Sequence, residues 1–402
     1  MHLSSKSPAT ESKPLRYTVG VMQALVEATD EVAFELMVQK SLALVRETLN
    51  EELGLDIQFF NFSGPHLTPE SGSYAAMDFL RIGLNEKIER NIDFLLIVTE
   101  VDLSASKLAY ALALPSQLTN VAVISTKRLD PAFWGEASTV ETSPRRLSTL
   151  MLHSFGHLLN LSHEDDNHNI MYDFKAVAEL DRMVDFTDPQ RRVVLKNLPI
   201  EARERVSNRE SGRWGFITSA ILINTRSILA GIHRANPLKL LARLPTMITA
   251  ALSVLIFLLF TPDMWDVASV VELYQIVIFA VLAISGATLA LYKSFASGPV
   301  SSRDRTLSES AVVTETVIIL SLFLTMAVLF IAFGGLIYLA IATIFPQRLM
   351  QTWTTVVPAT GFQQHAKLCI FISGLSILAG SLGGRADSKE LIRGVLFTDE
   401  ES

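Results

Sequence analysis

Long apolar runs dominate the second half of this 402-residue chain. A bilayer has a hydrocarbon core about 30 Å thick, which about 20 residues of α-helix can cross. Four runs approach or reach that length, with no acidic or basic residue in their interiors: 244–260, 272–292, 316–345 and 366–384. The sequence therefore predicts an all-α transmembrane domain of four helices over residues 244–384. The third run is longer than a span requires, so we expect its helix to tilt or to project.

Basic residues are divided unevenly among the loops beside these runs. Cytoplasmic loops are enriched in Lys and Arg. One set of loops holds only Arg348 and Lys367, and the other set holds Arg234, Lys239, Arg243, Lys293, Arg303, Arg305, Arg385, Lys389 and Arg393. We therefore expect both termini in the cytoplasm, including a tail over 385–402. Residues 1–16 are polar and lack the apolar stretch of a signal peptide, so we expect a disordered tail there.

A charged connector is expected over residues 191–243. Its basic side chains favour a position close to the lipid bilayer, with some attraction to anionic lipid. Within it, 216–232 is apolar but is interrupted by Asn224 and Arg226. Because an arginine is costly inside a membrane, an interfacial or packed helix is favoured, with a fifth span as the alternative.

The preceding segment, 17–190, alternates short apolar runs with longer amphipathic patterns. Strands are predicted at 17–21, 55–62, 93–100 and 120–126, and helices at 29–53, where Gly54 ends the pattern, and 73–90. This alternation predicts an α/β soluble domain with a mixed, mostly parallel sheet and packed helices. The net charge of -7 gives no reason to expect nucleic acid, and the single cysteine, Cys369, excludes a disulfide framework.

Three histidines lie together near the end of this segment. Ser143 and Pro144 signal the start of a helix that carries His153 and His157, which are four residues apart and therefore share one face. Asn160 readily accepts the left-handed conformation that ends a helix, so the chain can turn back and bring His163 to the same place. Three imidazoles and one open position suit zinc and the activation of water. A site that has lost its metal is the alternative.

The spacing of these histidines resembles the metzincin signature H-E-x-x-H-x-x-G-x-x-H, and Met171 falls where that family has its Met-turn. Within the metzincins, segments 93–104, 121–129 and 145–163 are similar to the archaemetzincins, with 121–129 matching their edge-strand segment. The resemblance implies a metzincin-like fold and a zinc peptidase site with His153, His157 and His163 as ligands. Met171 would form a hydrophobic floor beneath the metal.

This chain differs from the family pattern at positions that the family uses for catalysis and for binding a second zinc. Ser154 stands at the position of the catalytic Glu, and Asn160 at that of the Gly. Archaemetzincins hold a second zinc with cysteines at the positions of Glu164 and Asn169, so we expect this chain to lack it. Glu164, Asp165 or Asp166 could supply a substitute base, but a solvated cluster or support of a histidine is the simpler interpretation. We interpret His168 as a loop histidine and Tyr172 as a packing residue.

Together these features predict a membrane-anchored, archaemetzincin-like zinc protein that is a pseudopeptidase or a weak metallopeptidase. Its zinc cleft would bind a peptide or protein ligand. One alternative is an active membrane-bound metalloprotease that uses another carboxylate. Another is a membrane effector or channel that is controlled through the zinc domain. Small residues at spacing four, such as Ser376, Gly380 and Gly384, suggest close helix packing within one chain or in a homo-oligomer.

Overall fold

The chain divides into two compact units, residues 1–205 with 399–402, and residues 206–398. The computed structural model describes residues 16–26, 30–65, 76–104, 110–137, 139–202, 213–296, 309–346, 352–353, 361–383 and 395–396. Gly384 and most of the two predicted tails lie outside the described residues; of the tails only Arg16, Val395 and Leu396 are described, and Val395 and Leu396 are buried. Each unit has its own core, as sequence patterning predicts for an α/β segment followed by a helical one.

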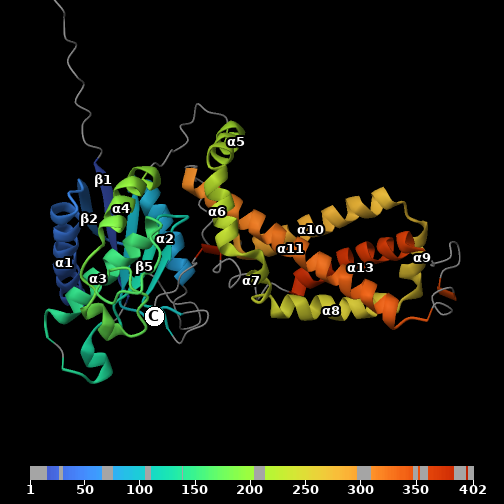
Figure 1. Cartoon of the computed structure of the whole chain (residues 1–402), viewed down its shortest axis with the longest axis horizontal. Coiled ribbons are helices and arrows are strands. Elements are labelled where there is room, and N and C mark those ends of the chain that lie inside the picture. Colours follow the sequence, from blue (N-terminus) through green and yellow to red (C-terminus); the bar gives the residue numbers. More distant parts are fainter. Residues whose placement is uncertain are drawn as a thin grey trace, which may run out of the picture. The chain divides into compact units, whose positions relative to one another are not determined.

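A five-stranded sheet forms the centre of the N-terminal unit, in the order β2-β1-β3-β5-β4 (Figure 1). The four parallel strands are β1 (Tyr17–Ala24), β2 (Ile57–Ser63), β3 (Phe94–Thr99) and β5 (Val121–Ser125). Every residue of β3 and β5 is buried, which is typical of parallel strands covered on both faces. The mostly parallel sheet predicted from the sequence is confirmed.

One strand, β4 (Ala113–Ser116), is absent from the sequence prediction. It pairs antiparallel with β5 and forms one edge of the sheet. The strand has only four residues, one of them Pro115, and proline is tolerated only where no ladder hydrogen bond is needed, as at an edge. The interpretation of 121–129 as an edge-strand segment is therefore wrong, because β5 lies between β3 and β4.

Helices cover both faces of this sheet. The helix α1 (Glu31–Arg46), its continuation η1 (Glu47–Glu52) and α3 (Thr142–Leu158) share one apolar core, whereas α2 (Ala76–Glu89) packs on the other face, where Gly83 lies against Leu95 and Ile97. Gly54 has φ of 68°, which ends the α1–η1 segment as predicted. The helix α3 begins at Thr142, two residues before the predicted Pro144, so this proline occupies the first turn, where no N–H is required.

The helix α4 (Asp188–Glu201) belongs to the same core. Its Val194 and Leu198 are buried against the residues around α3. Residues 191–201, at the start of the expected connector, are therefore packed into the N-terminal unit.

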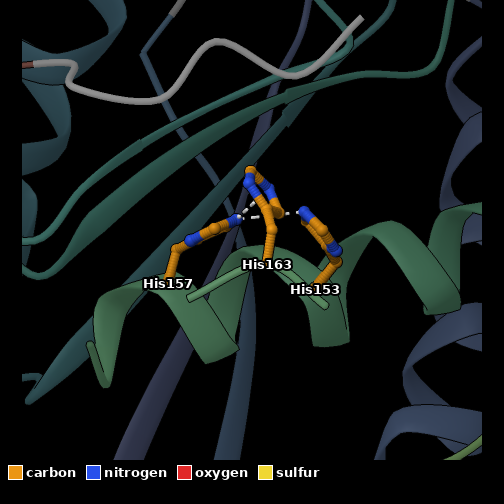
Figure 2. A group of neighbouring side chains, drawn as sticks. All are labelled: His153, His157 and His163. Carbon is orange, nitrogen blue, oxygen red and sulfur yellow. Dashed lines mark hydrogen bonds between the residues drawn. The ribbon is translucent and has the colours of Figure 1, made fainter. Parts of the chain in front are cut away.

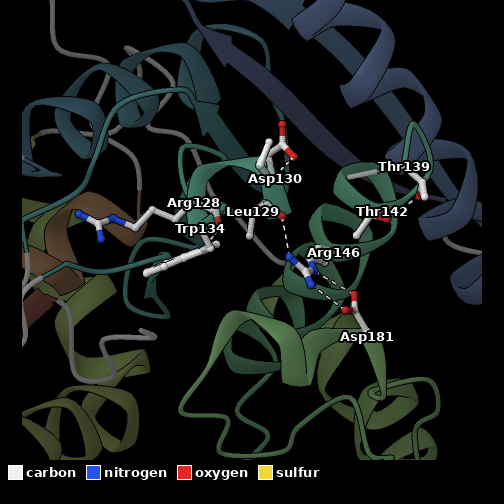
Figure 3. A network of polar contacts seen from close by, with 9 residues as sticks. Arg128, Leu129, Asp130, Trp134, Thr139, Thr142, Arg146 and Asp181 are labelled. Atoms are coloured by element: carbon white, nitrogen blue, oxygen red, sulfur yellow. Dashed lines mark hydrogen bonds and ion pairs between the residues drawn. The ribbon is translucent and has the colours of Figure 1, made fainter. Parts of the chain in front are cut away.

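A buried arginine joins α3 to the segments on either side of it (Figure 3). Arg146 has a side chain that is 4% exposed, and it donates to both carboxylate oxygens of Asp181, in η3 (Val177–Asp181), at 2.9 and 2.7 Å. Its third donor reaches the carbonyl of Leu129 at 2.9 Å, just before η2 (Pro131–Trp134). Two parallel hydrogen bonds to one carboxylate form a strong, paired interaction that stabilises the buried guanidinium charge.

The second unit is helical among the residues that the structure describes. Within the described part of the unit, three helices are long and apolar enough to cross a membrane: α10 (Leu273–Ala296), α11 (Glu309–Thr343) and α13 (Phe362–Gly383). The number rises to five if each of two bent helix pairs counts as one span. The predicted third run forms one unbroken helix of 35 residues, α11.

The two bent pairs differ from the predicted straight helices. The run 244–260 forms α8 (Pro245–Leu259), which has only 15 residues and meets α9 (Pro262–Val270) at a bend of 81°. The run 216–232 forms two helices, α5 (Arg213–Ile223) and α6 (Thr225–Ala235), with a bend of 70°. Pro262 supplies no N–H to continue α8, and Asn224 bonds its own side chain to the Ala220 carbonyl at 3.0 Å.

The helix α13 packs against α8, α9, α10 and α11. A Cβ at Gly380 would lie 2.6 Å from Ala251 Cβ and 3.0 Å from the carbonyl oxygen of Met247, both on α8. Small residues let two helix backbones approach closely. The predicted small-residue face of α13 is therefore used within the chain at Gly380. Between α6 and α8 lies a single short helix, α7 (Pro237–Leu241).

We predict that Arg146→Met lowers the free energy of unfolding by about 2–3 kcal/mol, since it removes three hydrogen bonds to a buried charge while Asp181 stays partly solvated. Hydrogen exchange of the α3 amides in the full chain measures this loss. Arg128→Met is the matched control. Its pair with Asp102 is more exposed, so a loss of about 1 kcal/mol or less is expected. Equal losses in the two variants would contradict the prediction.

In the helical unit, Gly380→Ala is expected to cost about 1–3 kcal/mol, because the added methyl group must push α8 away from α13. Gly335→Ala provides the control, as no atom lies within 4 Å of a Cβ there. That variant should be neutral or more stable by up to about 1 kcal/mol, the helix-propensity difference between the two residues. Denaturant unfolding of the full chain in detergent compares the two. A harmless Gly380→Ala would refute the close packing of α13 on α8.

Candidate metal centre

The three predicted histidines meet at one point (Figure 2). Nε2 of His157 lies 3.0 Å from Nε2 of His153 and 3.1 Å from Nε2 of His163. One ligand atom from each of the three residues lies within 4.8 Å of the others. His153 is 0% exposed and His157 is 7% exposed, while His163 is partly exposed.

This spacing is close to that of a tetrahedral metal site. With zinc–nitrogen bonds of about 2.0–2.1 Å, two ligand nitrogens lie about 3.3 Å apart. Hydrogen bonds between the histidines explain this arrangement less well than a bound metal ion does. A neutral imidazole has one N–H, so Nε2 of His157 can donate a hydrogen bond to only one of its two neighbours. A cation accepts the lone pairs of all three. The donor set therefore fits zinc or another imidazole-preferring metal.

A hydrogen bond of its second ring nitrogen, Nδ1, fixes the orientation of His153. Its Nδ1 lies 2.6 Å from the carbonyl oxygen of Ile170, which can only accept a hydrogen bond. The proton must then sit on Nδ1, which leaves the Nε2 lone pair facing the cluster. A carbonyl or carboxylate in this place is the usual support of a metal-binding histidine.

A tight turn brings the third histidine back to the helix. Asn160 has φ of 65°, the left-handed conformation expected from the sequence. The N–H groups of Asn160 and Leu161 donate to the carbonyls of His157 and Gly156, each at 3.0 Å. These bonds close the end of α3 and reverse the chain before His163.

Met171 lies in the core beside this turn. It is 0% exposed, and a Cβ at Gly156 would overlap its sulfur. Its carbonyl accepts the N–H of Glu164 at 2.8 Å, which holds the backbone next to His163. Met171 therefore supports the loop by packing and through its backbone. Its role as a floor beneath a metal stays a prediction.

Ser154 points into the protein interior. It is 0% exposed, and its hydroxyl is buried without a hydrogen-bond partner among the described residues. A buried, unsatisfied hydroxyl is unusual and costs about 1–3 kcal/mol. The position that would carry a catalytic carboxylate is thus closed to solvent in this structure.

No carboxylate joins the histidine cluster within the described part of the chain. Glu164, Asp165 and Asp166 are exposed, and Asp166 accepts the backbone N–H of His168 at 3.0 Å. His168 is exposed and lies outside the cluster. Tyr172 is half-buried and packs against the core, as expected for a packing residue.

Several supporting groups were missed by sequence reasoning. They are the Ile170 carbonyl, the amide pair of Asn169 and Gln190, and Asn197, which donates to the Leu159 carbonyl at 2.7 Å. A backbone carbonyl carries no sequence signal. Gln190 and Asn197 come from α4, well beyond the signature, whereas Asn169 lies in the loop after His163 and its position had been noted only as that of a missing cysteine.

Comparison with known proteins identifies similar chains. No family model matches this sequence. An archaemetzincin of Thermococcus kodakarensis is 29% identical over 104 residues, which are 26% of this chain and 56% of the relative. The chain thus spans little more than half the length of the curated relative that it matches. The N-terminal part is archaemetzincin-like.

Solved structures are also similar to part of this chain. An archaemetzincin from Methanopyrus kandleri has a TM-score of 0.37 at 19% identity, over 46% of this chain and 96% of that chain. A zinc-dependent peptidase from Methanocorpusculum labreanum has a TM-score of 0.34 at 18% identity, over 44% and 99%. An archaemetzincin from Archaeoglobus fulgidus, complexed with malonate, has a TM-score of 0.33 at 18% identity, over 44% and 99%.

Addition and removal of zinc test whether the histidine cluster binds a metal ion. Zn²⁺ at a free concentration 100 times its Kd should stabilise the full chain by about 2.7 kcal/mol, because the metal binds only the folded cluster. A chelator should reverse the rise in Tm, and His157→Ala should abolish it. His168→Ala, an exposed histidine of the same loop, is the control and should keep the full effect. A loss as large as that of His157→Ala would place the metal elsewhere.

Proposed function

We propose that this chain is a membrane-anchored zinc-binding protein with an archaemetzincin-like N-terminal unit. His153, His157 and His163 hold one zinc ion, as the zinc-dependent relatives suggest. The metal site then recognises the end of a peptide or a partner protein, and it hydrolyses peptides weakly or not at all. Bound zinc would supply a Lewis acid that polarises a carbonyl or water ligand.

The observation that carries this proposal is the environment of Ser154. Peptide hydrolysis at such a site needs a carboxylate that takes a proton from water and gives it to the leaving amine. Ser154 is fully buried, and among the described residues its hydroxyl has no hydrogen-bond partner that could take its proton. General acid/base transfer is worth on the order of 10²- to 10⁴-fold in rate, so losing it separates metal binding from efficient catalysis.

The membrane part of the proposal rests on the helical unit. The helices α10, α11 and α13 have the length and composition of spans. The excess of basic residues in one set of loops supports a cytoplasmic position for both termini and for the zinc-binding unit. The bilayer is therefore the first partner of this chain, and a second copy that docks through membrane helices is a further one.

Metal content and peptidase activity of the purified full chain test this function together. We expect one zinc ion per chain and no cleavage above background. Ser154→Glu should restore cleavage by about 10²- to 10⁴-fold if the carboxylate alone is missing. Adding His157→Ala to that variant should abolish the gain, and unchanged zinc content in Ser154→Glu shows that the larger side chain is accommodated.

Two results would contradict the proposed function. The first is peptide cleavage by the unaltered chain that disappears with His157→Ala, and Glu164→Gln would then test the nearest substitute base. The second is an unaltered chain that binds no zinc, which would make the cluster a structural remnant.

A further inference from the structure

A single peptide group lies behind the metal centre. The carbonyl of Ile170 faces Nδ1 of His153 at 2.6 Å, and the N–H of Met171 belongs to the same peptide plane. That N–H donates to Oδ1 of Asn169 at 2.7 Å. Because a peptide group is rigid and planar, fixing the N–H fixes the direction of the carbonyl. The side chain of Asn169 therefore controls the group that orients His153.

Asn169 is itself held by a second amide. Its Nδ2 donates to Oε1 of Gln190 at 2.9 Å, and Nε2 of Gln190 donates back to Oδ1 of Asn169 at 3.0 Å. The two side chains are 3% and 5% exposed. A reciprocal pair of this kind fixes both amide orientations, and a chain of buried hydrogen bonds strengthens its members.

The same glutamine lies in the first turn of α4. Its Oε1 also accepts the N–H of Thr187 at 2.9 Å, which completes the capping box of that helix. One turn from its other end, Asn197 binds the carbonyl of Leu159, where α3 ends. Helix α4 therefore supports the histidine site at two points, the loop at Asn169 and the end of α3 at Leu159. It is the last described element before the second unit begins at Val206.

We propose that Asn169 and Gln190 are positioning residues of the metal centre, which act on His153 through the peptide group between Ile170 and Met171. The inference rests on the proposed zinc-binding function. It predicts that the metal affinity of the N-terminal unit depends on how α4 is docked. Zinc loading and the docking of α4, the helix that leads toward the membrane helices, are then reciprocally coupled.

Zinc affinity of the full chain in detergent, measured against a competing chelator, tests the pair. Asn169→Leu keeps the side-chain shape but loses the acceptor, and Gln190→Met loses both amide bonds. Each should weaken zinc binding by about 10- to 100-fold, the usual effect of removing the support of a metal-binding histidine. Asn169→Asp keeps an oxygen for the Met171 N–H, so its affinity should stay close to that of the unaltered chain.

A second amide pair, in which Gln23 is buried and Asn61 partly buried, supplies the control. Nε2 of Gln23 donates to Oδ1 of Asn61 at 2.9 Å between β1 and β2, away from the histidine loop. Gln23→Met should lower the Tm without changing zinc affinity. The absorption of the Co²⁺-loaded protein adds a readout that general destabilisation does not move, and Asn169→Leu should change it because His153 rotates.

The results distinguish the positioning role of Asn169 and Gln190 from the proposed zinc-binding function. If Asn169→Leu and Gln190→Met bind zinc as tightly as Gln23→Met does, the positioning role is wrong and the zinc function stands. Should the unaltered chain show no zinc binding that depends on His157, both claims fail together.

Discussion

The enclosure of α3 is the constraint on which the rest of the N-terminal unit depends. Every residue from Arg146 to Leu158 is buried, so the helix that carries two of the histidines has no free face. The sheet covers one side, α1 another, and the loop after Asn160 closes the third. Among the three histidines, His153 is fully buried and His157 nearly so, while His163 on the returning loop is partly exposed. The loop therefore decides what can reach the metal centre.

Much of this arrangement could be predicted from the sequence, because it depends on local patterns. The spacing of His153 and His157 fixes their common face, and Asn160 marks the turn. Strands β3 and β5 are continuous apolar runs. The short edge strand β4 could not be predicted, since its four residues show no alternation and include a proline. The bends at Asn224 and Pro262 were missed for another reason. Hydropathy measures composition and is insensitive to the direction of a helix axis.

The support of the histidines was also beyond sequence reasoning. It depends on a backbone carbonyl and on amides whose partners are separated by 21 residues. The site therefore combines ligands that a motif reveals with a scaffold that only the fold reveals. Holding a cation needs the first set in the correct orientation, whereas peptide hydrolysis needs a further carboxylate that takes a proton from water and passes it to the leaving amine. This chain has the structural means for the former, and its Ser154 position is packed as part of the core.

The length of α11 has a consequence for the second unit. At about 1.5 Å per residue its 35 residues measure about 50 Å, against a hydrocarbon core of about 30 Å. The tilt needed to hide that excess would exceed the usual range of about 0–40°. If α11 crosses a bilayer, one end must stand in water or among lipid headgroups. Polar contacts mark its N-terminal end, where Glu309 accepts a hydrogen bond from Asn224 and Glu315 accepts one from Tyr292. The corner between α5 and α6 would then sit at headgroup depth, where Arg226 can remain hydrated.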